Sequence, residues 1–409
     1  MDAKSLFSDR DKVFIYLERY VNNGSPSGFT DIRTTSAHTN PFTGVERFPL
    51  LEFNDADTKC IHLGSKINIF NLGINYAHPD SLHSGNLLGS ERIVKESDLI
   101  VSPTASGRTM LIRDSIHSSF IKLTYDISRI GRVDRQLALN VCQSSREITD
   151  TLLKCIEDGK LPKSFAILRD LSAKISMLNV DGKIFEWGTI YRERNPYPNT
   201  NQIRTLVPGF SLFGVDRQSE SDEYLLNQLI QLSNKSPERY LVDLLKMIVD
   251  GYWGVVLNCA FHLEYHSQNC LFEVDDSYNI VRLVYRDMDS VDKDIPLARQ
   301  LGLRSEWESY PYSCMDETFY AYKIRSSYMY DFKLGEYLLS PLIEVVAKRF
   351  NLNPPEIYRE IKNYVQRNYV SLLPATYFPT DGCWYDCDNT ERKPGEQRQY
   401  YAHKNPKYR

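Results

Sequence analysis

Apolar positions recur at helical spacing in several parts of the chain. In the segment 237–266, leucines, valines and aromatic residues repeat every three or four positions. Ser236 and Pro237 precede them, and these residue types are common at the cap and in the first turn of a helix. The pattern therefore predicts a long and mostly buried helix. Shorter amphipathic helices are predicted over 11–23, 144–160, 221–235, 332–350 and 354–370.

Helix boundaries are predicted from residues with a known preference for helix ends. Ser144 or Ser145 is the expected cap of the helix over 144–160, and Gly159 is its expected end. Asn353 is the expected cap of the last helix. These assignments place most helical residues in the second half of the chain.

Strand-like segments dominate the first half. Runs rich in β-branched and aromatic residues occupy 101–104, 109–113 and 119–127, and shorter apolar runs lie between 40 and 75. Asp181-Gly182 separates two further runs, a sequence that suits a tight hairpin turn. A second hairpin is predicted over 270–290.

This distribution predicts an α+β fold with a boundary near 215–225. A β-rich middle region, 66–220, follows a short N-terminal region, 1–65. A helical, α/β region, 221–409, follows the boundary.

Composition narrows the class of protein. The 409 residues are 42% hydrophobic and 25% charged, with a net charge of −4, as expected of a soluble globular protein and not of the basic face of a nucleic-acid-binding protein. The N-terminus is charged and lacks an apolar h-region, so no secretory signal is expected, and no apolar run is long enough to span a bilayer; a cytoplasmic location is therefore expected. The eight cysteines form no CxxC pair, which favours reduced thiols over a zinc site.

Polar side chains gather in "EYHSQNCLFEVD", which begins at Glu264. On an extended or turning backbone, Glu264, His266 and Gln268 share one side, with Asn269 beside them. The following hairpin returns Asp287 towards the start of its first strand. Carboxylates bind Mg²⁺, and amides and imidazole contact phosphate oxygens, so the group suits a nucleotide with its metal. A polar helix end whose side chains satisfy free carbonyl groups is the alternative.

A second group of polar residues lies in "PTASGRTM". Ser106, Arg108 and Thr109 lie between strand-like segments, and Arg132 follows. Arginine binds phosphate or carboxylate through two parallel hydrogen bonds, and the hydroxyl groups add short contacts. A solvated strand edge is the alternative. Because neither a Walker A motif nor GxGxxG occurs, a nucleotide site built between the two regions is the favoured interpretation.

The two motifs together resemble a known family. "EYHSQN" with the later Arg286-Asp287, and "SGRT" with "KLTYDISRIGR", are similar to signatures of the NRPS-independent siderophore synthetases, the IucA/IucC (aerobactin-synthetase-like) family. The resemblance covers roughly 70–290. It implies a cupped-hand fold in which 66–220 form the fingers, 221–409 the palm and 1–65 a shortened thumb-like region.

The resemblance also implies an activity. Members adenylate a carboxylic acid with ATP and Mg²⁺ and then join it to an amine, hydroxylamine or hydroxyl nucleophile, as in siderophore or other specialised-metabolite biosynthesis. The implied partners are these small molecules and, as an option, a second copy of the chain in a homodimer, with no nucleic acid and no membrane.

Site residues are carried over position by position from the same resemblance. The implied catalytic residues are Arg108, Arg132 and His266. Glu264 and Asp287 are the implied metal ligands. The implied ATP-binding residues are Ser106, Arg108, Thr109, Ser128, Arg132, Glu264, His266, Gln268, Asn269 and Asp287, with Ser128 standing where the family has Thr.

One family element departs from the pattern. The His-Pro-x-x-Lys-x-Arg-like element, which helps to recognise the acid, is reduced to "AHPDSLHSG", in which Leu82 stands where the Lys would be and the Arg is missing. His78 and His83 remain as candidate substrate contacts. The loss of two cations favours an acid that carries less charge than citrate. Arg392 and Lys393 are candidates for the family's C-terminal basic residue.

Two other functions remain open at this point. A His-x-x-Asn segment followed by a hairpin and Arg-Asp loosely resembles a kinase catalytic loop, which favours a phosphotransferase. The shortened front and the altered His-Pro element are compatible with a non-catalytic ATP-binding relative. The reaction products distinguish these readings, because phosphoryl transfer releases ADP and adenylation releases AMP.

Overall fold

The structure is a computed structural model of the chain. It describes residues 1–22, 45–56, 58–65, 73–82, 93–113, 119–125, 136–180, 182–219, 223–303, 326–375, 377–379, 382–386, 400–403 and 405–409. Within these residues, no helix is both long enough and apolar enough to cross a membrane.

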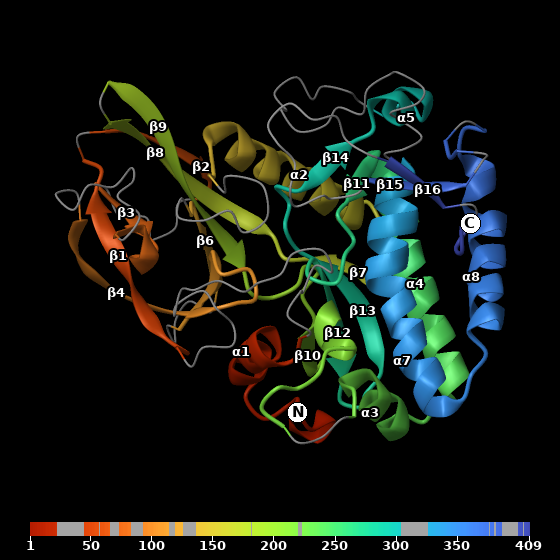
Figure 1. Cartoon of the computed structure of the whole chain (residues 1–409). Coiled ribbons are helices and arrows are strands. Elements are labelled where there is room, and N and C mark those ends of the chain that lie inside the picture. Colours follow the sequence, from red (N-terminus) through yellow and green to blue (C-terminus); the bar gives the residue numbers. More distant parts are fainter. Residues whose placement is uncertain are drawn as a thin grey trace.

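A large antiparallel sheet forms one half of the molecule (Figure 1). Its strand order is β2-β8-β9-β6-β5-β4-β1-β3. The strands are β1 (Phe48–Asn54), β2 (Lys59–Gly64), β3 (Ile74–Ala77), β4 (Ile93–Pro103), β5 (Thr109–Ile112), β6 (Ser119–Leu123), β8 (Asp170–Val180) and β9 (Lys183–Glu193). Side chains alternate between two apolar clusters, as the period of a strand requires. Met110 and Ile112 lie in one cluster, and Leu111 lies in the other.

A smaller sheet lies next to the large one, with the order β10-β12-β13-β7. Its strands are β7 (Phe165–Ile167), β10 (Arg204–Pro208), β12 (Cys270–Asp275) and β13 (Ile280–Tyr285), and β7 runs parallel to β13. Two-stranded sheets are formed by β11 (Phe261–Leu263) with β14 (Val291–Lys293) and by β15 (Cys383–Asp386) with β16 (Tyr400–His403).

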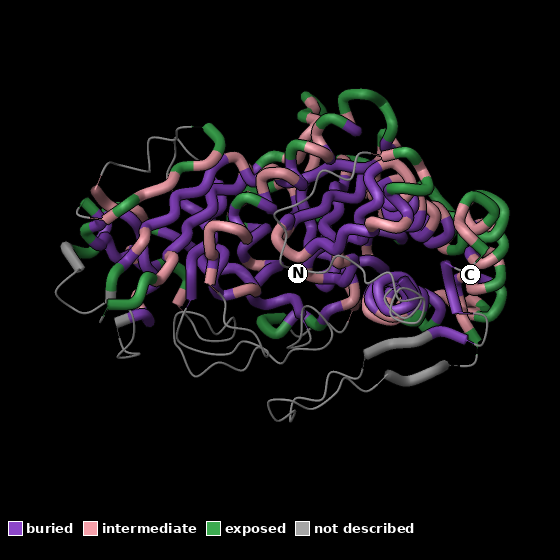
Figure 2. Tube along the Cα trace, turned by 90° about the horizontal axis from the view of Figure 1, so that it is seen from above, coloured by how far each residue is buried: buried purple, intermediate pink, exposed green. Residues whose placement is uncertain are grey.

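Helices cover both sheets. The helices are α1 (Arg10–Tyr20), α2 (Leu139–Glu157), α3 (Leu225–Leu232), α4 (Pro237–Cys259), α5 (Ile295–Gln300), α7 (Ser340–Phe350), α8 (Pro354–Asn368), the π-helix η5 (Tyr328–Leu339) and the short 3₁₀ segments η1 (Ala3–Ser5), η2 (Pro79–Leu82), η4 (Gly209–Leu212) and η6 (Val370–Leu372). Figure 1 shows α4, α7 and α8 side by side against the smaller sheet. In Figure 2, buried chain continues from the large sheet into this helical half.

The core of the helical half is built around α4. The Trp253 side chain is fully buried, and its ring centroid lies 4.9 Å from that of Tyr330 and 5.9 Å from that of Phe378. Aromatic rings in such tilted and edge-on arrangements bury much apolar surface. A large share of the aromatic residues of the sequence therefore serves packing.

The helix α1 connects the two sheets. Phe14 and Ile15 belong to the same apolar cluster as Leu111 and Phe120 of the large sheet and Leu206 of the small sheet. The burial of these side chains on both sides of α1 holds the two sheets in a defined relative position.

The long predicted helix begins as expected and ends earlier than expected. Ser236 Oγ accepts the Arg239 N–H at 3.4 Å, which confirms the predicted cap. The helix ends at Cys259, because Ala260 adopts a left-handed backbone with φ of 52°. Phe261 then starts β11 and pairs with Lys293 of β14. The prediction of helix over 261–266 was therefore wrong, since Phe261–Leu263 pair with β14, a strand that is distant in the sequence.

The predicted N-terminal cap of α2 was also wrong. The helix begins at Leu139, so Ser144 and Ser145 lie within it. The Ser145 hydroxyl donates a hydrogen bond to the carboxylate of Asp170 in β8. Gly159 follows the helix with φ of +67°, as a predicted stop requires.

The remaining predicted elements are found with small differences. The hairpins β8–β9 and β12–β13 are confirmed. Asn353 occupies the cap position of α8, but its side chain makes no capping hydrogen bond. The single helix predicted over 332–350 consists of the π-helix η5 followed by α7.

A buried ion pair within the large sheet provides a test of this packing. Lys174 Nζ lies 2.8 Å from Asp55 Oδ2, and both side chains are fully buried. Lys174→Met is expected to lower the free energy of unfolding by about 3–5 kcal/mol, because it leaves a buried carboxylate without its counter-ion. Urea denaturation measures the loss.

Lys183→Met, at the exposed start of β9, is the matched control and is expected to change stability by less than about 0.5 kcal/mol. Equal stabilities of the two variants would contradict the role of the ion pair.

Candidate functional site

The loop between β11 and β12 holds His266 in a defined orientation. The His266 ring is buried, and its Nδ1 accepts the Gln268 N–H at 3.2 Å. A neutral ring in this position carries its hydrogen on Nε2. His266 Nε2 lies 3.6 Å from Glu264 Oε2 and 3.4 Å from Asn269 Nδ2. Glu264 and His266 of the predicted group therefore lie together in a turn, with Asn269 beside them, while the described contacts of Gln268 involve its backbone.

The hairpin β12–β13 brings Asp287 back to this loop. Cys270 pairs with Tyr285, and the Arg286 N–H donates to the Asn269 carbonyl at 3.0 Å. Asp287 then adopts a φ of +87°, which is uncommon for a residue other than glycine. The return of Asp287 to the start of the first strand was predicted from the sequence.

Two carboxylates that follow β13 meet cations of the large sheet. Lys122 Nζ of β6 forms ion pairs with Asp287 and, at 2.5 Å, with Asp289 Oδ1. Arg192 Nη2 of β9 lies 3.5 Å from Asp287 Oδ1, and Arg108 Nη2 lies 3.4 Å from Asp289 Oδ2. These five residues are named here the ion cluster.

Burial and charge act in opposite directions in the ion cluster. Burial by itself would raise the pKa of the Asp287 carboxyl. The neighbouring Lys122, Arg192 and Arg108 outweigh burial and hold this pKa well below its ordinary value. Asp287 is therefore ionised at neutral pH.

Arg192 is fixed from its other side. Its Nε lies 2.5 Å from Asp170 Oδ1, and Asp170 also accepts the hydrogen bond from Ser145 of α2. Burial lowers the pKa of Arg192, but Asp170 more than compensates and raises it. The guanidinium is thus a permanent positive charge at the junction of the two sheets.

The "SGRT" turn places Arg108. Ser106 Oγ accepts the Thr109 N–H at 3.0 Å, and Gly107 between them has a φ of +71°. Thr109 pairs with Lys122 across β5 and β6. Within the described residues, Ser106 and Thr109 thus shape the turn, while Arg108 and Lys122 carry the charge.

A glutamate that the sequence did not single out joins the two motifs. The Glu18 side chain of α1 is fully buried. Its Oε2 accepts the Ala105 N–H at 3.0 Å, and its Oε1 lies 2.6 Å from Arg286 Nη1. Arg286 Nε donates in turn to the Gln268 carbonyl at 2.9 Å. The only signal in the sequence was an acid among the buried positions of an amphipathic helix.

Lys333 was also not predicted. It lies in the π-helix η5 and forms an ion pair with Glu264. Glu264 therefore contacts His266 on one side and a lysine on the other. Nothing in the sequence indicated that residue 333 would reach this loop.

Other predicted residues lie elsewhere. Ser128, Arg132, His83, Arg392 and Lys393 lie outside the described residues.

His78 follows β3 and is fully buried. Its ring lies edge-on to Phe48 and Tyr125, with Nδ1 3.4 Å from Asp80 Oδ2. The Gln268 contacts described here involve its backbone, while its side chain is partly exposed.

The predicted metal ligands are ion-paired with lysines. Glu264 contacts Lys333, and Asp287 contacts Lys122. Within the described part of the chain, no group of three or more His, Cys, Asp or Glu residues is arranged to hold a metal ion. These donors do not form a preassembled metal site, so the assignment of Glu264 and Asp287 to Mg²⁺ stays a prediction.

Comparison with solved structures identifies the fold. Aerobactin synthetase IucC from Klebsiella pneumoniae matches with a TM-score of 0.65 and 15% identity, over 90% of this chain and 72% of that chain. IucA from the same organism matches with a TM-score of 0.66 and 12% identity, over 95% and 77%. The petrobactin biosynthesis protein AsbB from Bacillus anthracis matches with 0.61 and 13%, over 90% and 71%.

A further IucA structure, which has ATP bound, matches with a TM-score of 0.65 and 13% identity, over 89% of this chain and 71% of that chain. No protein-family model matches the sequence, and a comparison with curated proteins finds no match either. The chain thus has the fold of these synthetases at very low sequence identity, and the predicted α+β class is confirmed.

The buried Glu18 generates a prediction for the geometry of the site. Glu18→Gln is expected to lower the free energy of unfolding by about 3 kcal/mol, because Arg286 loses the carboxylate that pairs with it in the interior. Chemical denaturation measures the change. Glu238→Gln, in the exposed first turn of α4, is the control, and a loss no larger than in this control would contradict the assignment.

The lowered pKa of Asp287 predicts a dependence of stability on pH. A carboxyl whose pKa is depressed by folding stabilises the folded state above its unfolded pKa, about 3.9, and loses this contribution as the pH falls towards the folded value. Asp287→Asn is therefore expected to be less stable than the original chain at neutral pH, and the difference should shrink below about pH 4. Denaturation curves from pH 7 downwards measure it. A difference that stays constant over this range would contradict the depressed pKa.

Proposed function

We propose that this chain is an ATP-dependent ligase that adenylates a carboxylic acid and joins it to an amine, hydroxylamine or hydroxyl nucleophile, as in the biosynthesis of siderophore-like metabolites. Its fold, which is that of aerobactin synthetases, supports this proposal. The observation that carries it is the ion cluster beside His266, where cations of one sheet meet a loop of the other.

The cations of the ion cluster are suited to the phosphates of ATP. Arg108, Lys122 and Arg192 contribute three positive charges, which Asp287, Asp289 and Asp170 balance in the structure. The contact of Arg108 Nη2 with Asp289 Oδ2 is 3.4 Å long, at the outer limit of a hydrogen bond. In the proposed complex, Arg108 turns from Asp289 to a phosphate of the nucleotide, while Lys122 and Arg192 stay paired with their carboxylates.

His266 is the proposed group that stabilises charge at the reacting phosphate. Its Nδ1 accepts a backbone N–H, so a neutral ring carries its hydrogen on Nε2, the proposed donor to the phosphate. Because the ring is buried and its Nδ1 is hydrogen-bonded to the loop backbone, its dipole needs little rearrangement as negative charge develops. Donors fixed in this manner typically contribute about a hundredfold or more to the rate.

The proposed reaction has two steps. First, an oxygen of the substrate carboxylate attacks the α-phosphorus of ATP, and the bond to the bridging oxygen breaks to release pyrophosphate. Second, the nitrogen or oxygen of the nucleophile attacks the acyl carbon, AMP leaves with the electron pair of the cleaved bond, and the nucleophile loses a proton. Neither step needs a covalent bond to the protein, so positioning and charge neutralisation by the site supply the rate enhancement.

Magnesium is proposed to enter on the nucleotide. Mg²⁺ binds proteins through one or two carboxylates together with substrate phosphates, and it supplies charge neutralisation when bound. Asp287 and Glu264 are the proposed carboxylates, and each would exchange a lysine contact for the ion.

The acid is proposed to carry less charge than citrate. The element that would supply two cations contains Leu82 where the Lys would be and lacks the Arg. The adjacent His78 is buried against Phe48 and Tyr125, so its ring belongs to the packing of the large sheet. Acids with one or two carboxylates are therefore the first class to test.

Reaction products provide the test. With ATP, Mg²⁺, hydroxylamine and a panel of mono- and dicarboxylic acids, the protein is expected to release AMP and pyrophosphate in equal amounts and to form a hydroxamate of at least one acid. ADP and a phosphorylated acceptor in their place would indicate the phosphotransferase. ATP binding without acid-dependent turnover would indicate a non-catalytic nucleotide-binding protein. Either outcome contradicts the proposal.

Variants then test the assigned residues. His266→Ala is expected to lower kcat/KM for adenylation about a hundredfold with little change in stability, because one donor to the reacting phosphate is removed. His62→Ala, on the exposed side of the edge strand β2, is the control and should behave as the original chain. Normal adenylation by His266→Ala would refute the assignment of this residue.

A further inference from the structure

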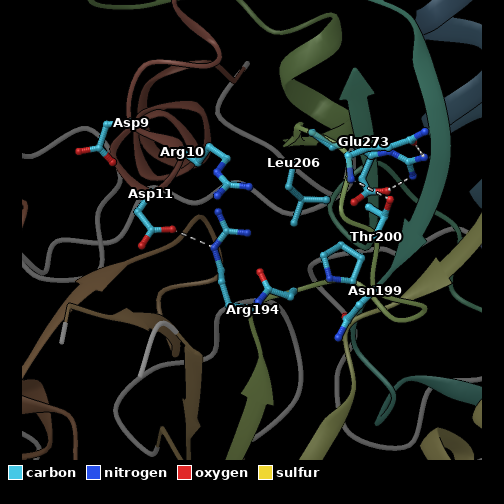
Figure 3. Close-up of a pocket in the computed structure, with 12 residues that line it drawn as sticks. Asp9, Arg10, Asp11, Arg194, Asn199, Thr200, Leu206 and Glu273 are labelled. Atoms are coloured by element: carbon cyan, nitrogen blue, oxygen red, sulfur yellow. Dashed lines mark hydrogen bonds and ion pairs between the residues drawn. The ribbon is translucent and has the colours of Figure 1, made fainter. Parts of the chain in front are cut away.

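A polar pocket lies at the start of α1 (Figure 3), and its lining shares no residue with the ion cluster. Its volume is about 620 Å³, which is within the range of small-molecule sites. Arg194 and Arg204 line it together with Glu273 of β12. The loop that carries His266 precedes Cys270 at the start of β12, and Glu273 lies three residues further along, about 10 Å at the rise of a strand.

Two guanidinium groups face one another in this pocket. Figure 3 shows the side chains of Arg10 and Arg194 pointing towards each other from α1 and from the end of β9. Arg194 is only 7% exposed, and its guanidinium lies 4.7 Å from the ring centroid of Phe14. Its charge is therefore held in place in the pocket wall.

The approach of the two arginines is unfavourable without an anion. Burial lowers the pKa of Arg194, and Arg10 lowers it further, although Asp11 acts in the opposite direction. Arg10 is exposed, so water screens part of the repulsion, but two like charges that face one another still repel. An oxyanion between the two guanidinium groups would remove this cost and accept hydrogen bonds from both.

The acids around the pocket already have partners. Asp11 Oδ1 lies 3.2 Å from Arg194 Nε, and Asp9 caps α1 by accepting the Lys12 N–H at 3.1 Å. Glu273 Oε2 lies 2.9 Å from Arg204 Nη1.

Arg10, in contrast, forms no ion pair with any residue that the structure describes. It is therefore the surplus cation of the pocket. Asn199, Thr200 and Gln202 line another part of the pocket with neutral groups that can donate and accept hydrogen bonds.

We propose that this pocket binds a small polar molecule through a carboxylate or phosphate group placed between Arg10 and Arg194, with Asn199 and Thr200 contacting its hydroxyl or amide groups. None of the residues that line the pocket belongs to the ion cluster or to the His266 loop, so the proposed ligand is a second small molecule and not the nucleotide. Arg204 and Glu273 form another wall, in which Glu273 is paired with both Arg204 and Arg282.

Anion titrations test the proposal. Inorganic phosphate and malonate serve as probes, and isothermal calorimetry measures their binding to the full chain. Arg10→Gln is expected to weaken the binding of the recognised anion about tenfold or more, because hydrogen bonds to a charged group are lost. Asn199→Asp, which places a negative charge in the pocket wall, is expected to have the same effect. The anion whose binding is lost identifies the group, carboxylate or phosphate.

Lys4→Gln is the matched control, since it removes a positive charge at an exposed position of η1 outside the pocket. It should bind both anions as the original chain does, and ATP binding should be the same in all variants. The proposal is overturned if Arg10→Gln binds both anions normally, if Lys4→Gln weakens binding as much, or if the original chain shows no saturable binding of either anion.

Discussion

The structure depends on the neutralisation of buried charge where its two sheets meet. The side chains of Lys122 and Arg192 extend from the large sheet into the interior, where a charge without a partner is costly. The acids that pair with them, Asp287 and Asp289, follow β13 of the smaller sheet. Arg192 has a further partner, Asp170, within the large sheet, but the described ion pairs of Lys122 are both with acids that follow β13. Apolar packing around α1 brings the sheets together, but the ion cluster requires one relative position, because ion pairs are directional and apolar contacts are not.

Local features of the sequence predicted the elements well. The start of α4, the β8–β9 and β12–β13 hairpins and the return of Asp287 all follow from caps, turns and alternation, which act over a few residues. Errors arose where a distant partner decides the structure. The end of α4 depends on the pairing of Phe261 with Lys293, and the role of Ser145 depends on Asp170. Nothing near these residues encodes their partners.

The candidate site shows the same division. Short motifs identified Arg108, His266 and Asp287, because residue types in a fixed spacing carry the chemistry. Glu18 and Lys333 could not be predicted, since their importance lies only in what they contact across the fold. The match to synthetase structures at 12–15% identity agrees with this division: an arrangement of elements can be retained while most residues differ.

The π-helix η5 and α7 form one continuous helical segment. The wider turns of η5 set the direction in which Lys333 points relative to the apolar face of α7. A π-helical turn contains more residues than an α-helical turn, as if a residue had been inserted into an α-helix. Deleting one residue before α7 would rotate Lys333 by about 100° relative to α7, and the lysine would then point away from Glu264. The apolar face of α7 would still pack. The π-helical turns thus set the direction of the Lys333 side chain towards Glu264 in the His266 loop, independently of how α7 is packed.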